Sequence, residues 1–411
     1  MQLSRRAGAE VLSAPPAAWL DLLRRQLRDA ASTLAERQIV ALHYRGSLDG
    51  AEGQPLSLLY VGQEAHAGAF EIYLGGDGTR APPAPEKLFR GTLLDYLGPR
   101  GRADARLDAD VVVRQMFLPG AVHPGELLHL PFIDGVLPVS GRVEEQIQTV
   151  RSKAHRRRLR KVLRSASHPW RISKSPSDFD LFYSAMYEPY VRQKFGLRAH
   201  LDSRETLGEL FRHDGRILLV SHLGKPVCGS LLFESSSKTL FYHRNGFVDG
   251  ASLPPLLLAQ RTAALELALM QHASDSGARL IHLGFTRAIL SSGLFVHKRR
   301  LGCSFIASSY SPVFRFGVRA ERRPAVFARF PFLSGAQGAF VANLGYAQGG
   351  PTRTVRRWRG LVKNYVFRGL NRVVLHTDSP RLDPGRVAYE TALRQVLGGT
   401  PLVVAPSASA A

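Results

Sequence analysis

Cysteine is scarce in this chain: its 411 residues include two, Cys228 and Cys303. Both lie in apolar stretches of the kind that form strands. Two isolated thiols provide neither a disulfide framework nor the repeated cysteine and histidine spacing of a zinc site. We therefore expect no metal cofactor, and a reducing compartment in which free thiols persist.

Segments with the pattern of a membrane-spanning helix or of a signal peptide are also lacking. The longest apolar helical pattern, residues 254–273, contains Arg261 and Glu266, whereas a spanning helix needs about 20 predominantly apolar residues. Near the N-terminus, the apolar stretch after Arg6 is interrupted by Glu10 and is too short for the core of a signal peptide. We expect a cytoplasmic protein and leave open its association with the inner membrane face.

Positive charge is abundant and concentrated. The formal net charge is +22, of which residues 151–164 contribute +8 without any acid. Residues 313–411 contribute +11, from fifteen Lys and Arg against four acids. Such local excess favours an anionic partner, which could be nucleic acid, an anionic lipid surface, an acidic carrier protein or a phosphorylated donor.

Apolar periodicity and turn residues predict the elements of the first half. They are, in order, a helix over residues 15–37, strands over 38–44, 56–61 and 69–74, a helix over 85–97 and a strand over 110–118. A connection rich in proline and glycine follows over residues 119–141. We place a domain boundary at residue 141, before a basic helix.

The second half repeats this order of elements. They are a helix over residues 143–164, a helix over 177–195 capped by Ser177, strands over 216–222, 226–233 and 239–244, a helix over 254–273 and a strand over 280–283. Helix, three strands, helix and strand therefore occur twice. The repeat is one of element order and not of residue identity.

Residues 279–303 carry the most informative motif. A strand ends at Leu283-Gly284, a loop with Arg287 and Gly293 follows, and the basic run Lys298-Arg299-Arg300 is closed by Gly302. This pattern resembles the end of the catalytic domain in FemAB-like and CelD/BioF-like acyltransferases, a branch of the GNAT superfamily. The resemblance extends loosely over residues 150–312 and weakly into the N-terminal third.

The resemblance implies an α/β fold with mixed sheets, built from tandem GNAT-like domains. Each domain would contain a helix, three antiparallel strands, a helix and a strand. The N-terminal domain would cover residues 1–141, the catalytic domain 142–312, and a basic C-terminal extension 313–411.

The implied activity is N-acyl transfer from an acyl thioester, acyl-CoA or a carrier-bound acyl group, to a primary amine by direct attack. In the family, the pantetheine arm enters between two splayed parallel strands, here residues 239–244 and 280–283, and the diphosphate lies over the next helix N-terminus. The matching donor-binding residues are Asn245, Gly246, Gly250, Ser252, Gly284 and Arg287.

The donor stays open, because this chain departs from the family pattern. The signature of ordinary acetyl-CoA enzymes, glutamine or arginine followed by x-x-glycine-x-glycine, is absent, and Pro254-Pro255 removes two amide donors. Fem-like relatives with the same gap use aminoacyl-tRNA. The alternative reading is a plain turn with proline at the first helical position.

Four residues are candidates for catalysis. The resemblance implies that Lys298 lies near the transfer centre, where an ammonium stabilises an oxyanion, with Arg287 as its companion. His243 and His282 fall on the two splayed strands and could accept the amine proton, and Tyr242 could donate to the leaving thiolate. For each, the alternative is an ordinary half-buried polar residue or, for Lys298, a solvated basic face.

Other features suggest partners or rival functions. Within the helix over residues 143–164, the basic residues 151–164 could present their cations to an acyl carrier protein, to tRNA or to an anionic membrane surface, as could the C-terminal arginines. Excess arginine alone is the alternative. Tyr187 and Tyr190, with Arg192, could border the acceptor site, although core packing is commoner for such residues.

His129 and Asp134 match the H-x-x-x-x-D of glycerolipid acyltransferases. The glycine-rich partner motif of those enzymes does not follow, so we do not adopt this assignment. Two rivals to thioester-dependent transfer remain: a Fem-type aminoacyl-tRNA-dependent transferase acting on a cell-wall precursor or lipid, and a non-catalytic scaffold that binds anionic membrane or nucleic acid.

Overall fold

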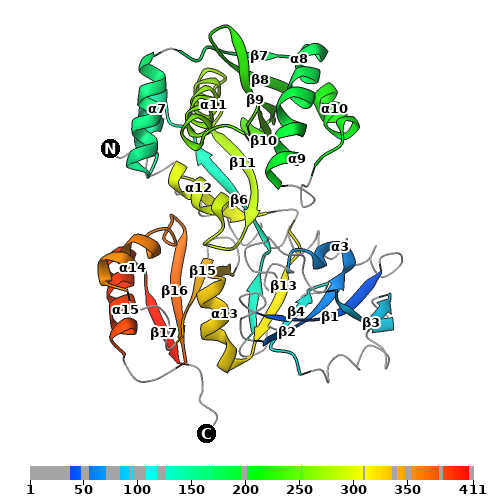
Figure 1. The fold of residues 1–411 in the computed structure, drawn as a ribbon, viewed down its shortest axis with the longest axis vertical. Coiled ribbons are helices and arrows are strands. Elements are labelled where there is room, and N and C mark those ends of the chain that lie inside the picture. Colours follow the sequence, from blue (N-terminus) through cyan, green and yellow to red (C-terminus); the bar gives the residue numbers. More distant parts are fainter. Residues whose placement is uncertain are drawn as a thin grey trace. The chain divides into compact units, whose positions relative to one another are not determined.

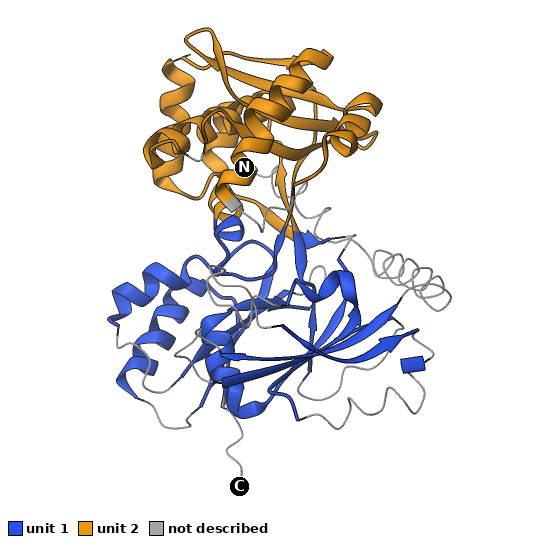
Figure 2. Cartoon of the chain, turned by 45° about the vertical axis from the view of Figure 1, so that its right-hand side comes forward, with its two compact units in different colours: residues 1–133, 286–296, 306–411 blue, residues 134–285, 297–305 orange. Residues whose placement is uncertain are grey.

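The computed structural model describes residues 38–47, 55–70, 84–92, 95–96, 108–117, 126–165, 167–195, 201–250, 252–308, 311–335, 340–347, 353–378 and 383–406. Contacts divide the chain into two compact units (Figure 2). Unit 1 comprises residues 1–133, 286–296 and 306–411, and unit 2 comprises residues 134–285 and 297–305. The helix predicted over residues 15–37 lies outside the described residues.

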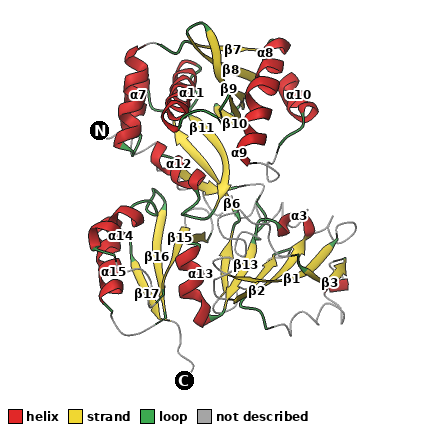
Figure 3. Ribbon diagram, viewed as in Figure 1, coloured by secondary structure: helices red, strands yellow, loops and turns green. Residues whose placement is uncertain are grey.

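Two mixed sheets organise the described residues, which confirms the α/β class (Figure 3). In unit 1 the strand order is β17-β16-β15-β14-β5-β13-β4-β2-β1-β3. The strands are β1 (Ile39–Ser47), β2 (Pro55–Gln63), β3 (Glu86–Gly91), β4 (Val111–Gln115), β5 (Glu126–His129), β13 (Phe314–Val318), β14 (Phe332–Ser334), β15 (Phe340–Tyr346), β16 (Leu370–Thr377) and β17 (Leu402–Pro406). The accompanying helices are α3 (Glu64–Ala67), η4 (Ala320–Arg322), α13 (Arg323–Arg329), α14 (Val355–Val362) and α15 (Pro384–Leu397).

Residues 313–411, predicted to form an extension, supply strands to the same sheet as the N-terminal residues. β13 pairs antiparallel with β4 from Phe314↔Gln115 to Val318↔Val111, and its other edge pairs with β5. The alternating residues of β13 are buried in an aromatic core with Phe70 and Phe332. Each predicted domain is one continuous stretch of the chain. Unit 1 is not continuous, because β13 pairs with β4, which lies about 200 residues earlier in the sequence.

Three sequence predictions for residues 69–141 need correction. The expected helix over residues 85–97 contains strand β3, which pairs with one edge of β1. The expected connection over residues 119–141 contains β5 and β6 (Phe132–Pro138). In both cases pairing with a neighbouring strand overrides the local propensity of the sequence. The expected strand over 69–74 also does not begin as predicted, because its described residues, Ala69 and Phe70, lie in a turn.

Unit 2 has the element order expected of a GNAT core (Figure 1). Its sheet runs β12-β6-β11-β10-β9-β8-β7. The remaining strands are β7 (Trp170–Ser173), β8 (Arg216–His222), β9 (Lys225–Glu234), β10 (Thr239–Phe247), β11 (Leu280–Arg287) and β12 (Ser304–Ala307). β7 to β10 are antiparallel, and helix α11 (Pro255–Asp275) crosses over to β11, which is parallel to β10.

Helices cover both faces of this sheet. On β9, Cys228 contacts the backbone of α11. Its neighbour Gly229 faces Phe182 of η2 (Phe182–Tyr187), a π-helical turn between α8 (Pro176–Leu181) and α9 (Glu188–Phe195). Successive residues of a strand point to opposite faces, so α11 and η2 cover opposite sides.

In unit 2 two helix predictions are refined, and one further helix was not predicted. The helix expected over 143–164 is two, α6 (Val143–Thr149) and α7 (Lys153–Ser165), because Val150 is extended and fully buried between them. Ser177 lies inside α8, so it is not the cap, and Ser175 takes the N-cap position. Helix α10 (Arg204–His213) was not predicted; its cap Ser203 accepts from the Thr206 amide.

Within the described residues no helix is both long and apolar enough to cross a bilayer.

Candidate active site

Strands β10 and β11 separate partway along their length. Their parallel pairing covers three residue pairs, from Thr239↔Leu280 to Phe241↔His282. Beyond this point β10 carries a bulge, where its register with β9 shifts between Tyr242 and Arg244, and a bulge bends a strand. In β11 the amide of Gly284 donates to Nδ1 of His282 at 3.2 Å. The described structure therefore contains the splayed pair that the resemblance implies.

Lys298 is buried next to this opening. It lies on α12 (Gly293–Leu301), its exposed fraction is 4%, and its Nζ donates to the carbonyl oxygens of Gly284 at 2.7 Å and Phe285 at 2.9 Å. Its stem passes Gly135 of β6, where a Cβ would lie 2.8 Å from the lysine Cδ. Lys298 is thus held at the end of β11, not on a solvated face.

The environment of Lys298 changes its acidity. Burial lowers the pKa of its ammonium to about 8, and Cys303 and Asp134 oppose part of this change. The ammonium remains mostly charged at neutral pH. Two of its three N–H groups are bound to carbonyls, and the described residues offer no acceptor for the third. That N–H can donate to an oxygen that gains negative charge.

His282 is engaged through both ring nitrogens. Because Nδ1 accepts from the Gly284 amide, the neutral ring carries its proton on Nε2, which lies 3.2 Å from a carboxylate oxygen of Asp134 on β6. The ring also packs against Phe241, with centroids 4.9 Å apart. With both nitrogens occupied, His282 orients the splayed strands rather than offering a lone pair.

His243 occupies the bulge of β10 and packs against Phe233. Burial, reinforced by the neighbouring Arg244, lowers the pKa of His243 to about 4. The ring is therefore neutral at physiological pH, and its conjugate acid is strong, which makes it a weak base. The bulge also interrupts the alternation that the sequence pattern assumes for this strand.

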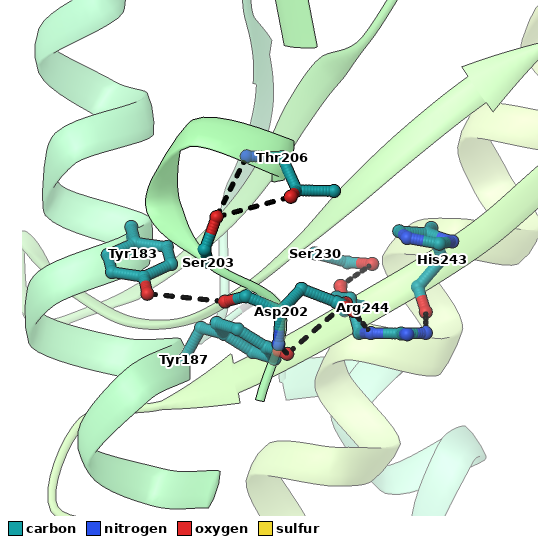
Figure 4. Close-up of polar contacts among 8 residues, drawn as sticks. All are labelled: Tyr183, Tyr187, Asp202, Ser203, Thr206, Ser230, His243 and Arg244. Atoms are coloured by element: carbon teal, nitrogen blue, oxygen red, sulfur yellow. Dashed lines mark hydrogen bonds and ion pairs between the residues drawn. The ribbon is translucent and has the colours of Figure 1, made fainter. Parts of the chain in front are cut away.

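Arg244 anchors the loop before α10 to β10 (Figure 4). Its Nε donates to Asp202 Oδ2 at 2.5 Å, while the Asp202 amide donates to the hydroxyl of Tyr187 at 3.1 Å. Tyr183 donates to the carbonyl oxygen of Asp202 at 3.2 Å. Tyr187, predicted to border the acceptor site, therefore helps to position this loop. Tyr190 is largely buried, with its ring 5.1 Å from that of Phe247.

Tyr242 points toward α11. It packs against the core of unit 2. Burial raises the pKa of its phenol well above the ordinary value, and the negative charge of Glu266 raises it further. The phenol therefore keeps its proton and remains a donor.

The predicted donor-binding turn differs from the structure. Asn245 and Gly246 belong to β10 and pair with β9. A Cβ at Gly246 would lie 2.5 Å from backbone atoms of η2, so this glycine permits close packing. Two of the remaining four predicted residues lie on β11. Arg287 ends this strand and belongs to unit 1, and Gly284 has φ +72°, a conformation that favours glycine.

Backbone amides around the start of α11 are already used. Those of Gly250 and Ser252 donate to Phe247 and Asp249 within the turn. Pro254 and Pro255 have no amide proton, and the next amides of the helix, except that of Leu256, donate back to Pro254. This helix end does not suit a diphosphate, which needs several free amides.

His129 and Asp134 do not form a catalytic pair. His129 is buried in unit 1 with its ring 4.8 Å from that of Phe332, and burial lowers its pKa to about 4. Asp134 belongs to unit 2 and pairs with His282. Within the described residues, no three His, Cys, Asp or Glu side chains are arranged so that they could hold a metal ion.

Sequence reasoning missed several residues that the structure brings together. They are Gly135, His155, Asp202, Glu266 and His297, together with Asp134, which the sequence indicated only as part of the H-x-x-x-x-D match. A signal existed for Glu266, since an acid in the middle of an otherwise apolar helix must find partners when that helix is buried. No local pattern identified the partners themselves.

No family model matches this chain, and no curated protein matches it in sequence. Among solved structures, it is similar to the C-terminal domain of a putative lysylphosphatidylglycerol synthetase from Agrobacterium fabrum, with 10% identity and a TM-score of 0.33 over 74% of this chain and 92% of that one. It is also similar to a probable N-acyltransferase from Enterococcus faecalis, with 10% identity and a TM-score of 0.26 over 73% and 62%. A GCN5-related N-acetyltransferase from Sphaerobacter thermophilus gives 10% and 0.29 over 71% and 84%. These scores are low, so the GNAT-like description rests on the strand order and splayed strands of unit 2.

Proposed function

We propose that this chain is an N-acyltransferase of the FemAB-like or CelD/BioF-like type, which moves an acyl group from a thioester to a primary amine. One observation carries the proposal: β10 and β11 stop pairing at Phe241↔His282, and the buried ammonium of Lys298 is fixed at the adjoining end of β11. A thioester arm needs such an opening, and its carbonyl needs such a donor.

The chemistry would be direct attack of the amine on the thioester carbonyl. Negative charge then develops on the carbonyl oxygen, where the third N–H of Lys298 can stabilise it. Because two carbonyls already hold this ammonium, it need not reorganise as the charge appears. Tyr242, which keeps its proton, can donate to the departing thiolate.

A carrier-bound acyl group suits this site better than acyl-CoA. The first turn of α11 offers few amides for a diphosphate, and Leu256 at that end is 74% exposed. An acyl carrier protein needs no diphosphate at this position. We therefore place acyl carrier protein first among thioester donors.

Aminoacyl-tRNA is a second candidate donor, favoured by α7. Its exposed residues Lys153, Arg157, Lys161 and Arg164 are spaced by three or four positions, so they share one helical face. Leu159 and Val162 are buried on the other side. The described part of the chain pairs none of these four cations with a carboxylate. Such a row can follow phosphodiesters or an anionic membrane surface.

The test is a donor panel with product detection by mass spectrometry. Acetyl-CoA, palmitoyl-CoA, palmitoyl acyl carrier protein and lysyl-tRNA would each be incubated with lysine, spermidine and vesicles containing phosphatidylethanolamine. At least one combination should yield an amide. Lys298→Met should reduce kcat by about 100-fold or more, whereas Lys225→Met, at an exposed lysine at the start of β9, should leave the transfer unchanged.

Three outcomes distinguish the candidates. A steep fall of transfer from lysyl-tRNA with salt supports the tRNA-dependent reaction, and a flat response excludes it. Absence of an amide with every donor rejects the transferase. Retained binding to tRNA or anionic vesicles in that case would favour the non-catalytic scaffold.

A further inference from the structure

Glu266 is buried between two histidines near the middle of α11. Its side chain is 5% exposed, and its oxygens lie 2.5 Å from Nε2 of His155 on α7 and 2.9 Å from Nε2 of His297 on α12. The two imidazole rings are 6.3 Å apart. An isolated carboxylate would be costly at this position, so the three side chains form one unit, which we call the His155–Glu266–His297 cluster.

The carboxylate of this cluster is ionised. Burial alone would raise the pKa of Glu266, but the hydrogen bonds from His155 and His297 outweigh this effect and lower it to about 2. Burial also lowers the pKa of His297, and Glu266 reverses this change, so that the pKa of His297 is raised overall. Lys298 and Lys194 act in the opposite direction. His297 is thus a stronger base than an ordinary histidine.

The two histidines differ in access. The side chain of His155 is 12% exposed, whereas that of His297 is 45% exposed. Since Glu266 accepts from Nε2 of His297, the neutral ring carries its proton there and its lone pair on Nδ1. In the described structure no hydrogen bond engages that Nδ1. His297 therefore combines an oriented ring with an available lone pair, which neither His243 nor His282 provides.

The position of the cluster matches the proposed site. His297 directly precedes Lys298, and residues adjacent in a helix point about 100° apart. Lys298 reaches the end of β11, while His297 reaches α11. On β10, Tyr242 is close enough to Glu266 to feel its charge. The cluster and the splayed strands are therefore parts of one region of unit 2.

We propose that His297 is the catalytic base of the transfer, with Glu266 holding its ring through Nε2 and His155 fixing Glu266. This inference rests on the proposed function and adds the proton acceptor to it.

The step balances as follows. The amine nitrogen forms a bond to the thioester carbonyl carbon, and Nδ1 of His297 takes one proton from that nitrogen. The carbon–sulfur bond then breaks, and the electron pair leaves with sulfur. The thiolate takes a proton either from the imidazolium of His297 or from Tyr242, and in the second case Tyr242 regains a proton from that imidazolium through solvent. The products are an amide and a thiol.

The pH dependence follows from the charges around His297. Glu266 favours its protonated form, and Lys298 and Lys194 disfavour that form; the ring of His155 faces it across the cluster. Below the raised pKa of His297, Nδ1 carries a proton and cannot accept another. The transfer rate should therefore fall as pH decreases through that pKa.

The experiment uses the full chain and the donor and amine that give the most product in the panel above. His297→Gln keeps a side-chain amide that can reach Glu266, and His297→Ala leaves space for added imidazole. Both should lower kcat by about 100- to 10,000-fold, without changing the affinity for the donor. His297→Gln should lack the acidic limb of the pH profile, and imidazole should restore part of the activity of His297→Ala. His213→Gln, at an exposed histidine of α10, is the control and should behave as wild type.

A second measurement tests the proposal even if the His297 variants do not fold. NMR titration of protein with labelled histidines should show that Glu266→Gln lowers the pKa of His297 and moves the acidic limb of the rate profile to lower pH. Wild-type activity in His297→Gln, or an unshifted titration and rate profile in Glu266→Gln, would overturn the proposal while leaving the transferase intact. Absence of product with wild-type protein would reject the transferase and the base together.

Discussion

Lys298→Met should change how the stability of unit 2 depends on pH. In the folded chain, burial lowers the pKa of this lysine from its ordinary value of 10.5 to about 8. Between these two values the unfolded chain keeps the proton and the folded chain loses it. The free energy of unfolding therefore rises with pH across this window.

The magnitude follows from the size of the pKa change. Each pKa unit corresponds to about 1.4 kcal/mol, so the rise from pH 8 to pH 10.5 amounts to about 3 kcal/mol. With 4% exposure, solvent screens Lys298 little. Methionine has a similar length and no charge, so the variant lacks this contribution. The stability difference between wild type and Lys298→Met should shift by about 3 kcal/mol in favour of wild type as pH increases.

Urea unfolding followed by tryptophan fluorescence measures this difference. Trp170 bonds to Gln271 of α11 at 2.8 Å and reports on unit 2. Replacing Trp19 and Trp358 by phenylalanine removes the other two tryptophans. Lys161→Met, at an exposed lysine of α7, is the matched control and should follow wild type at every pH. Parallel curves for wild type and Lys298→Met would show that the ammonium is solvated, and the argument for oxyanion stabilisation would lose its basis.

Three further substitutions test the packing around the site. Gly135→Ala places a Cβ 2.8 Å from the Cδ of Lys298, so it should cost about 1–3 kcal/mol in urea unfolding and also reduce transfer, since the ammonium must move; unchanged kinetics would argue against a fixed lysine. Gly302 has φ +107°, and a Cβ added there would lie 2.8 Å from a backbone carbonyl oxygen of α6. Gly302→Ala should therefore lower the free energy of unfolding by about 1–3 kcal/mol in the same assay, and an unchanged value would contradict this close approach. Tyr187→Phe leaves the amide of Asp202 without its acceptor, and should cost about 1 kcal/mol and increase hydrogen exchange at that amide, which an unchanged exchange rate would refute.

The sequence by itself determined the local elements in the central part of unit 2. Alternation and turn residues gave β8 to β11, and the apolar run gave α11, because such patterns record which face of each element is buried. The motif from Gly284 to Gly302 indicated where to look for a lysine. The composition also showed where positive charge concentrates.

The tertiary structure decided which residues meet. His155 and Glu266 are 111 positions apart, and the strand partners β13 and β4 are farther apart still. The bulge at His243 shifted the alternation of β10, and the pairing of β3 with β1 overrode a helical pattern. The periodicity of a segment shows which of its faces is buried, but it does not show which other segment packs against that face. The neighbours of Lys298, Glu266 and His297 follow from packing between distant segments, and the sequence does not express that packing locally.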